Sequence, residues 1–300
     1  MSEQSVGGGA SRLPAAGPRR LRVRYAFMAP LAVLLGLIVV YPLAYSLWLS
    51  FTNFTITRPG QTRFVGLEQY ASLPANPTYV DALQNTFVFV LLAVSLELGL
   101  GLALALALQR QRWARNITRA FLLTPMFVTP IAVGLMFRFL LNQQLGPIPL
   151  LLGKVGVTIN FFGPDLALLS MVGIDVWQWT PFMLLLMLAG LESLPKEPFE
   201  AARVDGATAW FTFTRVTLPL LRPVIAVAVL IRALDAFKVF EYVFAITRGG
   251  PGTATETLQY QVYRTGFQFF RLGEAAAMAL VLVAIVLVIV VLLYRRLVLR

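Results

Sequence analysis

Three charged residues interrupt an otherwise apolar stretch and form the group best suited to bind a polar solute. Arg232, Asp235 and Lys238 recur at intervals of three residues, so on a continuous helix they form a stripe that drifts slowly around its surface. Adjacent members can pair, but one carboxylate cannot neutralise two cations, so a third partner or a hydrated cavity is needed. Inside a bilayer each such charge costs about 2.5–3.5 kcal/mol, and ionisable residues there often mark solute paths.

A second group places polar side chains among aromatic rings. It comprises Asp175, Trp177, Gln178, Trp179, Thr180, Pro181 and Phe182. Indole faces can stack on sugar rings while the polar groups bond to hydroxyls, but tryptophans also gather in the belt at a membrane interface. Spacing alone does not separate the two interpretations. Glu97 and Arg138 stand alone in other apolar stretches, and either could simply pair with another helix.

Several kinds of chemistry are excluded by composition. The chain has no cysteine and no histidine, which removes disulfides, thiol nucleophiles, histidine bases and Cys/His metal sites. Gly153 and Lys154 are followed by Val155 and lack the upstream glycine of a phosphate-binding loop. We therefore expect no metal site, no cofactor and no ATP hydrolysis on this chain.

The elements that must position these residues are membrane spans. Apolar residues make up 58% of the 300 and charged residues only 13%, about half the charged share of a soluble domain. A block of roughly 20 apolar residues crosses the hydrocarbon core as a helix. Six such blocks predict an all-α polytopic membrane protein: 25–49, 82–108, 118–141, 166–191, 218–246 and 273–294.

The positions of the basic residues predict the orientation. With the N-terminus inside, the inner segments hold 16 of the 25 Lys and Arg residues, the outer loops six and the spans three. This bias fits the positive-inside rule, so the net charge of +11 reflects topology rather than nucleic-acid binding. We expect cytoplasmic termini, a largely disordered tail over residues 1–24 and a transmembrane domain over 25–300 with its core at 82–294.

The hydrophilic break between the fourth and fifth blocks, residues 195–219, is the most informative segment. Pro198 suits a first helical turn, and Glu200 lies near the positive helix N-terminus. Asp205-Gly206 is a turn signal, and Trp210 and Phe211 follow. The segment therefore predicts two short helices that meet at a glycine and expose a surface for a protein partner; an ordinary amphipathic interfacial helix is the simpler alternative.

This segment resembles the EAA loop of ABC importer permeases. The resemblance rests on Glu200-Ala201-Ala202, then Gly206, then Leu218-Pro219. It implies a cytoplasmic coupling helix that docks on a separate ATP-hydrolysing subunit, with Glu200, Ala201, Ala202, Asp205 and Gly206 forming the docking element. It also implies that ATP and Mg²⁺ are bound by that partner ATPase dimer and that this chain is not itself an enzyme.

A second stretch is similar to the maltose-type, carbohydrate-uptake branch. It reads Arg248-Gly249-Gly250-Pro251, then Thr255, Thr257-Leu258, Tyr263, Gly266-Phe267 and Gly273-Glu274. The likeness is to the MalF-like partner, which implies a second, MalG-like permease, an extracytoplasmic solute-binding protein and a bacterial inner membrane. The chain departs from the maltose permease in lacking its extra N-terminal spans and in having a short first outer loop at residues 50–81.

The resemblance also implies a solute site between the fourth and fifth spans. Its expected residues are Trp179, Phe182, Arg232, Asp235, Ala236 and Val239, to which the charged stripe adds Lys238. The substrate would be a di- or oligosaccharide such as trehalose or maltose, or a polyol. An ion-coupled secondary transporter with Asp235 or Glu97 as relay is the alternative, and an intramembrane enzyme has almost no support.

Overall fold

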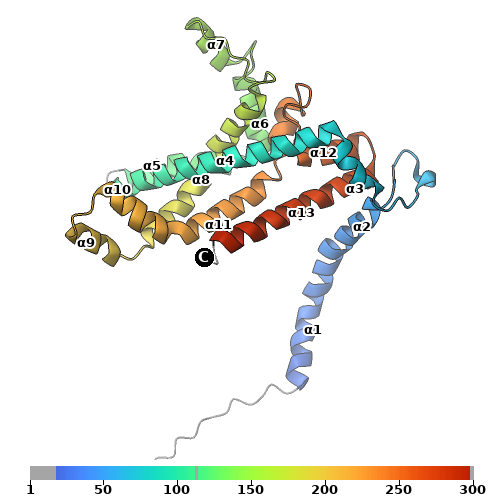
Figure 1. The fold of residues 1–300 in the computed structure, drawn as a ribbon, viewed down its shortest axis with the longest axis horizontal. Helices are drawn as coiled ribbons and strands as arrows, with labels where there is room; N and C mark the ends of the chain where they lie inside the picture. The colour runs from blue at the N-terminus through green and yellow to red at the C-terminus, as the bar shows by residue number, and fades with distance from the viewer. Residues whose placement is uncertain (1–17, 112–113, 298–300) are drawn as a thin grey trace, which may run out of the picture. The chain divides into compact units, whose positions relative to one another are not determined.

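The computed structural model describes residues 18–111 and 114–297, and this part of the chain is almost entirely helical (Figure 1). Before the middle of the sequence the main helices are α1 Pro18–Leu35, α2 Tyr41–Ser50, α3 Glu68–Ser72, α4 Pro77–Arg110, α5 Arg115–Leu123 and α6 Pro130–Leu140. After it come α7 Pro147–Lys154, α8 Ala167–Glu192, α9 Glu197–Val204, α10 Ala209–Thr212, α11 Leu218–Ala236, α12 Leu258–Tyr263 and α13 Leu272–Leu297. Residues 1–17 of the predicted tail lie outside the described part, and α1 already begins at Pro18.

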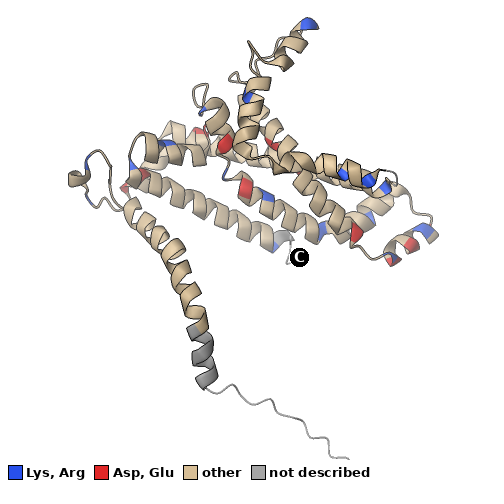
Figure 2. Ribbon diagram, turned by 180° about the vertical axis from the view of Figure 1, so that it is seen from behind, with Lys and Arg blue, Asp and Glu red and all other residues tan. Residues whose placement is uncertain are grey.

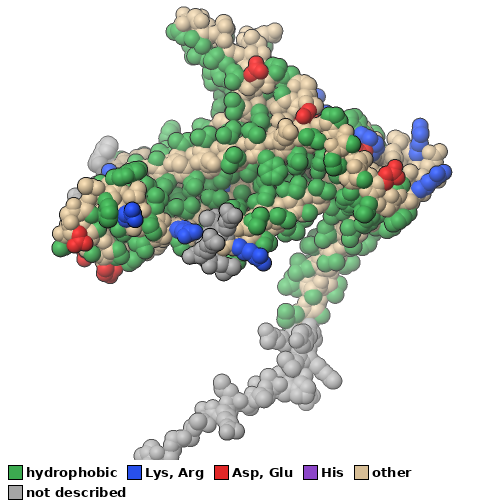
Figure 3. All heavy atoms as spheres, in the orientation of Figure 1, with side chains coloured by type: hydrophobic (Ala, Val, Ile, Leu, Met, Phe, Trp, Pro, Cys, Tyr) green, Lys and Arg blue, Asp and Glu red, His purple; other side chains and the backbone are tan. Residues whose placement is uncertain are grey.

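Five helical segments among the described residues are long and apolar enough to cross a membrane. They are Phe27–Ser50, Pro77–Arg110, Ala167–Glu192, Ala209–Ala236 and Leu272–Arg295. A sixth span is obtained when the bent pair Arg115–Phe127 and Pro130–Leu140 is counted as one. The surface over these helices is dominated by hydrophobic side chains (Figure 3), and charged residues are sparse along the helix middles (Figure 2). Both features suit a lipid environment.

The chain divides into two compact units, residues 1–48 and 49–300. The first contains α1, a π-helical turn at Gly36–Val40 and most of α2. Within this unit the apolar side chains of the span do not bury one another.

The second unit is built around α4 and α8, which pack along much of their lengths. A Cβ atom at Gly101 would lie 2.6 Å from the Cβ of Met183 and 2.9 Å from the nitrogen of Leu184. Only glycine permits this backbone approach, which brings the polar residues of the two helices within reach of each other. Helix α11 packs against α4, α8 and α13, so these four helices enclose the core.

The predicted third span is broken rather than merely kinked. Helix α5 continues through a 3-10 turn to Phe127, and α6 starts at Pro130 at an angle of 94°. Pro130 occupies the first helical position, where its missing N–H costs no hydrogen bond. The carbonyl of Val128 in the break accepts a hydrogen bond from Gln178 Nε2 at 2.6 Å. A neighbouring helix thus satisfies the freed backbone group, as non-helical backbone at membrane depth requires.

The predicted fifth span ends ten residues early. Helix α11 stops at Ala236, and a turn at residues 237–240 leads to a short π-helix at Val243–Thr247. The freed carbonyl of Val239 accepts from Thr257 Oγ1 at 3.1 Å. The prediction of a continuous helix to residue 246 is therefore wrong, and Lys238 lies past the helix end rather than on the helical stripe with Arg232 and Asp235.

Candidate functional site

A buried arginine ties three helices together through carboxylates. The Nε atom of Arg232 on α11 lies 2.8 Å from Glu97 Oε2 on α4, and its Nη2 donates to Glu97 Oε1 at 2.9 Å. Nη2 also contacts Asp175 on α8, and Nη1 donates to Asp235 Oδ2 at 3.0 Å. Arg232 is 2% exposed and Glu97 is fully buried.

Arg232, Glu97, Asp175 and Asp235 form an ionic cluster that resolves the charge imbalance noted in the sequence. Asp235 alone could not neutralise two cations, and Glu97 and Asp175 supply the further countercharge from helices distant in sequence. A buried charge without a partner costs several kcal/mol, so this arrangement lets α11 carry Arg232 through the apolar core. Asp235 also contacts the exposed Lys238 at 3.7 Å.

A cavity of about 320 Å³ opens beside the ionic cluster. It is lined by Pro130, Asp175, Trp179, Arg232, Asp235, Ala236, Lys238, Val239, Phe240, Glu241, Tyr242 and Gln259. Six of the seven predicted solute residues are thus brought together. Phe182 does not line the cavity; it packs edge-on against Trp179 with ring centroids 6.4 Å apart.

Trp179 links the aromatic group to the ionic cluster. The guanidinium carbon of Arg232 lies 5.1 Å from the centroid of the Trp179 ring, within the range of a cation–π contact. Trp177, in contrast, packs against Phe137 and lies outside the cavity. Of the two interleaved tryptophans, only Trp179 presents its ring to the polar cavity.

Sequence reasoning missed the residues that reach the cavity through the chain breaks. Glu241 and Tyr242 follow the turn at 237–240, and Pro130 follows the break in the third span. Tyr242 donates to Gln178 Oε1 at 2.6 Å, so Gln178 joins the two breaks. Gln259 comes from α12. No local spacing signals the break after Ala236.

The segment between α8 and α11 folds as two short helices on either side of Gly206. Helix α9 ends at Val204, Gly206 adopts a left-handed φ of +70°, and Thr208 caps α10 by accepting from the N–H of Phe211. Glu200, Ala201, Asp205 and Gly206 are exposed, whereas Ala202 is buried. Val204 and Trp210 expose 87% and 73% of their surface, a large apolar area for a polar loop.

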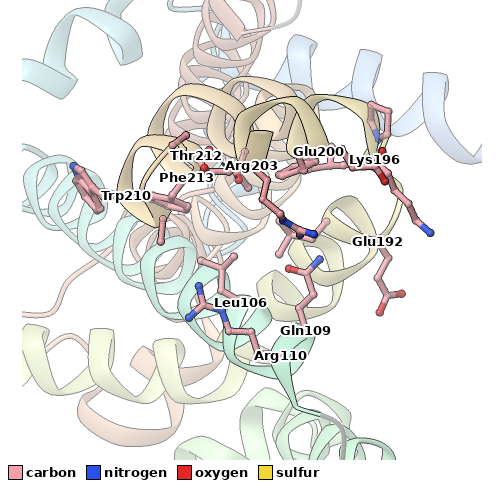
Figure 4. A pocket seen from close by; sticks show the side chains of 17 residues that line it. Leu106, Gln109, Arg110, Glu192, Lys196, Glu200, Arg203, Trp210, Thr212 and Phe213 are labelled. Carbon is pink, nitrogen blue, oxygen red and sulfur yellow. Dashed lines mark hydrogen bonds between the residues drawn. The ribbon is translucent and has the colours of Figure 1, made fainter. Parts of the chain in front are cut away.

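A cleft of about 1020 Å³ lies beneath these two helices. Figure 4 shows Leu106, Gln109 and Arg110 of α4 facing Glu200 and Arg203 of α9 across it. The loop therefore stands off the helical core and is attached to it chiefly through its two ends. At the same end of the molecule, Arg115 of α5 pairs with Glu192 of α8.

The opposite end of the second unit holds a buried acid. Glu256 is fully buried and pairs with Arg264 at 3.1 Å between Nη1 and Oε2. Burial raises the pKa of Glu256 to about 7, although Arg264 opposes the shift. Gly249 has a φ of +88°, and a Cβ there would lie 2.2 Å from Glu256 Oε2, so this turn requires glycine.

Broken spans border a charged, aromatic cavity, an arrangement that suits a membrane transport protein. The chain also matches the family described as "Binding-protein-dependent transport system inner membrane component" over residues 98–300. It belongs to this family and is a permease subunit of an ABC importer. The predicted class and helical fold are confirmed, and the relatives give no support to an ion-coupled transporter.

Individual relatives are similar to this chain over most of its length. A probable ABC transporter permease, y4oQ of Sinorhizobium fredii, is 36% identical over 87% of this chain and 86% of its own. The trehalose transport permease SugA of Mycobacterium tuberculosis is 32% identical over 89% and 86%. In structure, a bacterial ABC transporter involved in the import of the acidic polysaccharide alginate matches with a TM-score of 0.80 and 23% identity over 93% and 96%.

Proposed function

We propose that this permease moves a sugar or polyol, such as trehalose, maltose or a related oligosaccharide, through the cavity beside Arg232. The observation that carries the proposal is the juxtaposition of an indole ring, Trp179, with exposed acidic and basic groups at Asp235 and Lys238. Aromatic faces and hydrogen-bonding groups together match the two kinds of surface on a sugar ring. The relationship to a trehalose permease supports this substrate class.

Within this proposal the predicted site residues divide into roles. Trp179 stacks on the solute, and Asp235 and Lys238 bond to its hydroxyls. Ala236 and Val239, which are small or buried at the lining, shape the wall. Phe182 supports Trp179 from outside the cavity, and Arg232 holds Asp235 and Trp179 in place.

The energy comes from ATP and Mg²⁺ bound by a partner ATPase dimer, and a second, MalG-like permease completes the path. The coupling element comprises Glu200, Ala201, Ala202, Asp205 and Gly206. Its support is the exposed two-helix loop, in which Val204 and Trp210 present apolar surface. The family description supports a solute-binding protein as donor. The termini and the loop lie in the cytoplasm, as the distribution of basic residues indicates.

The test is uptake by the complete complex in proteoliposomes containing ATP. Radiolabelled trehalose and maltose are offered together with the binding protein, and Asp235→Ala is compared with Glu68→Ala, an exposed acid on α3. We expect uptake to fall at least tenfold in Asp235→Ala alone, with the complex still assembled. Normal uptake by this variant would show that the cavity is not on the solute path. Uptake that needs an ion gradient but no ATP would support the ion-coupled alternative.

A further inference from the structure

Arg232 is already paired with carboxylates of this chain, and this limits the charge of the solutes that the cavity can accept. Anionic groups such as carboxylates and phosphates are commonly recognised by the planar fork of an arginine. In Arg232 the Nε, Nη1 and Nη2 atoms each contact a carboxylate of this chain. One face of the guanidinium is covered by Trp179. Nη1 and Nη2 donate to carboxylates and Nε lies against Glu97 Oε2, so the buried fork offers no free pair of donors to an incoming anion.

The remaining charges at the cavity are predominantly negative. Asp235 and Glu241 are exposed at the lining, with Lys238 as the one exposed cation among the described lining residues. Lys238 is already shared with Asp235, and Glu241 makes no ion pair with any residue that the structure describes. Glu97 and Asp175 lie behind Arg232 and serve as its counterions. Among the exposed lining charges, Asp235 and Glu241 outnumber Lys238.

We infer that this cavity selects against anionic solutes and passes neutral ones, with Asp235 and Glu241 as the residues that set this selectivity. The inference rests on the proposed solute path and adds the charge class of its substrate. The fold does not decide this point, since a transporter with the same fold is involved in the import of an acidic polysaccharide. Unlike charges attract and like charges repel most strongly where walls of low dielectric focus the field.

The absence of cysteine permits a direct measurement of this potential. Gln259→Cys places a single thiol in the lining, at a partly exposed position, and Ser72→Cys on α3 serves as an exposed control outside it. In the assembled complex, each variant is treated with a cationic trimethylammonioethyl and an anionic sulfonatoethyl methanethiosulfonate. Mass spectrometry of this chain then gives the rate of modification by each reagent. For each variant, the ratio of the cationic to the anionic rate is divided by the same ratio measured for a free thiol in solution.

We expect the cationic-to-anionic ratio at Gln259→Cys to exceed that at Ser72→Cys at least fivefold. Adding Glu241→Gln should lower the ratio at least about twofold, as expected for the loss of one negative charge from the lining, and adding Lys238→Gln should raise it. Equal ratios at the two cysteines, an insensitivity to Glu241→Gln, or no reaction of Gln259→Cys with either reagent would each overturn the inference. The rates do not depend on transport, so loss of the charge preference with normal sugar uptake refutes the selectivity and leaves the proposed function standing.

Discussion

At the scale of single residues, Arg232 has the most severe electrostatic constraints. Removing its charge leaves Glu97 and Asp175 buried without a counterion, and breaking a buried ion pair in this way costs about 3–5 kcal/mol. We therefore expect Arg232→Gln to destabilise the permease by about this amount, measured as the thermal unfolding midpoint of the purified complex.

The matched control removes charge from both sides of the pair. Arg232→Gln combined with Glu97→Gln leaves one fewer uncompensated carboxylate and should recover part of the lost stability. If the single variant unfolds at the wild-type temperature, the cluster does not stabilise the fold, and Arg232 would have to be considered as a direct solute ligand again.

Glu256 gives a pH dependence whose sign follows from its pKa. The folded protein holds this proton up to about pH 7, whereas an unperturbed glutamic acid loses it near pH 4.5. Between these values unfolding releases a proton, so the free energy of unfolding should fall as pH rises from about 4.5 to about 7 and then level off. The full effect is at most about 3 kcal/mol, and it is checked by unfolding midpoints at pH 5 and pH 8.

The neutral isostere Glu256→Gln provides the comparison. It cannot titrate, so this contribution to the pH dependence between pH 5 and pH 8 should disappear while the burial of the side chain is kept. An unchanged slope in the variant would assign the dependence to another group.

Part of this residue-scale picture could be predicted from the sequence. The cost of charge in an apolar helix pointed to Arg232 and Asp235 and to a missing partner. The identity of that partner could not be predicted, because Glu97 lies 135 residues from Arg232 and no spacing rule links two helices that meet only in the folded bundle. Gly101, which allows α4 and α8 to approach, carried no signal of its own.

At the scale of elements, the loop at residues 195–219 depends on one backbone conformation. Gly206 has a φ of +70°, and a Cβ there would meet nothing within 4 Å, so a substitution is limited by backbone strain rather than by space. Valine should strain the turn by about 1–2 kcal/mol and displace α9 from α10. We expect Gly206→Val to insert normally but to bind the ATPase weakly, as measured by co-purification.

Asparagine tolerates the left-handed conformation and keeps a side chain of similar bulk. Gly206→Asn should therefore retain most of the ATPase, and the contrast between the two variants isolates the backbone effect. If both variants co-purify with the ATPase and transport at the wild-type rate, Gly206 is not needed for coupling.

The elements themselves differed in how well the sequence predicted them. Uninterrupted apolar blocks gave the second, fourth and sixth spans within a few residues, because hydrophobic length is the dominant constraint in a bilayer. The break at 237–240 contains neither proline nor glycine and depends on Thr257 capping the Val239 carbonyl. Such a tertiary hydrogen bond overrides local helix propensity and leaves no pattern in the neighbouring sequence.

At the scale of the whole molecule, the loop that contains α9 and α10 and the buried turn before α12 lie at opposite ends of the second unit (Figure 1). Ser193, beside the loop, and Ser72, on α3, are both exposed. In a cysteine-free chain, Ser193→Cys and Ser72→Cys should react with a membrane-impermeant maleimide from opposite faces. We expect Ser193→Cys to react only in inverted vesicles and Ser72→Cys only in right-side-out ones.

This experiment decides the orientation that the basic residues predict. Labelling of both positions from the same face would contradict the arrangement of the spans between them. Labelling from the two faces in the reverse sense would keep the spans but invert the molecule, and it would separate the loop from a cytoplasmic ATPase.

The four-residue cluster around Arg232 also shapes how such a permease can diverge. Glu97, Asp175 and Arg232 lie on three helices and neutralise one another. A substitution of one of them is therefore expected to destabilise the protein unless a second substitution compensates for it. On the open side, Lys238 and Glu241 make no ion pair with these three residues, and Asp235 pairs with Arg232 alone among them. Adaptation to a new nutrient is therefore expected to exchange these outer side chains first, while the inner three drift slowly and together.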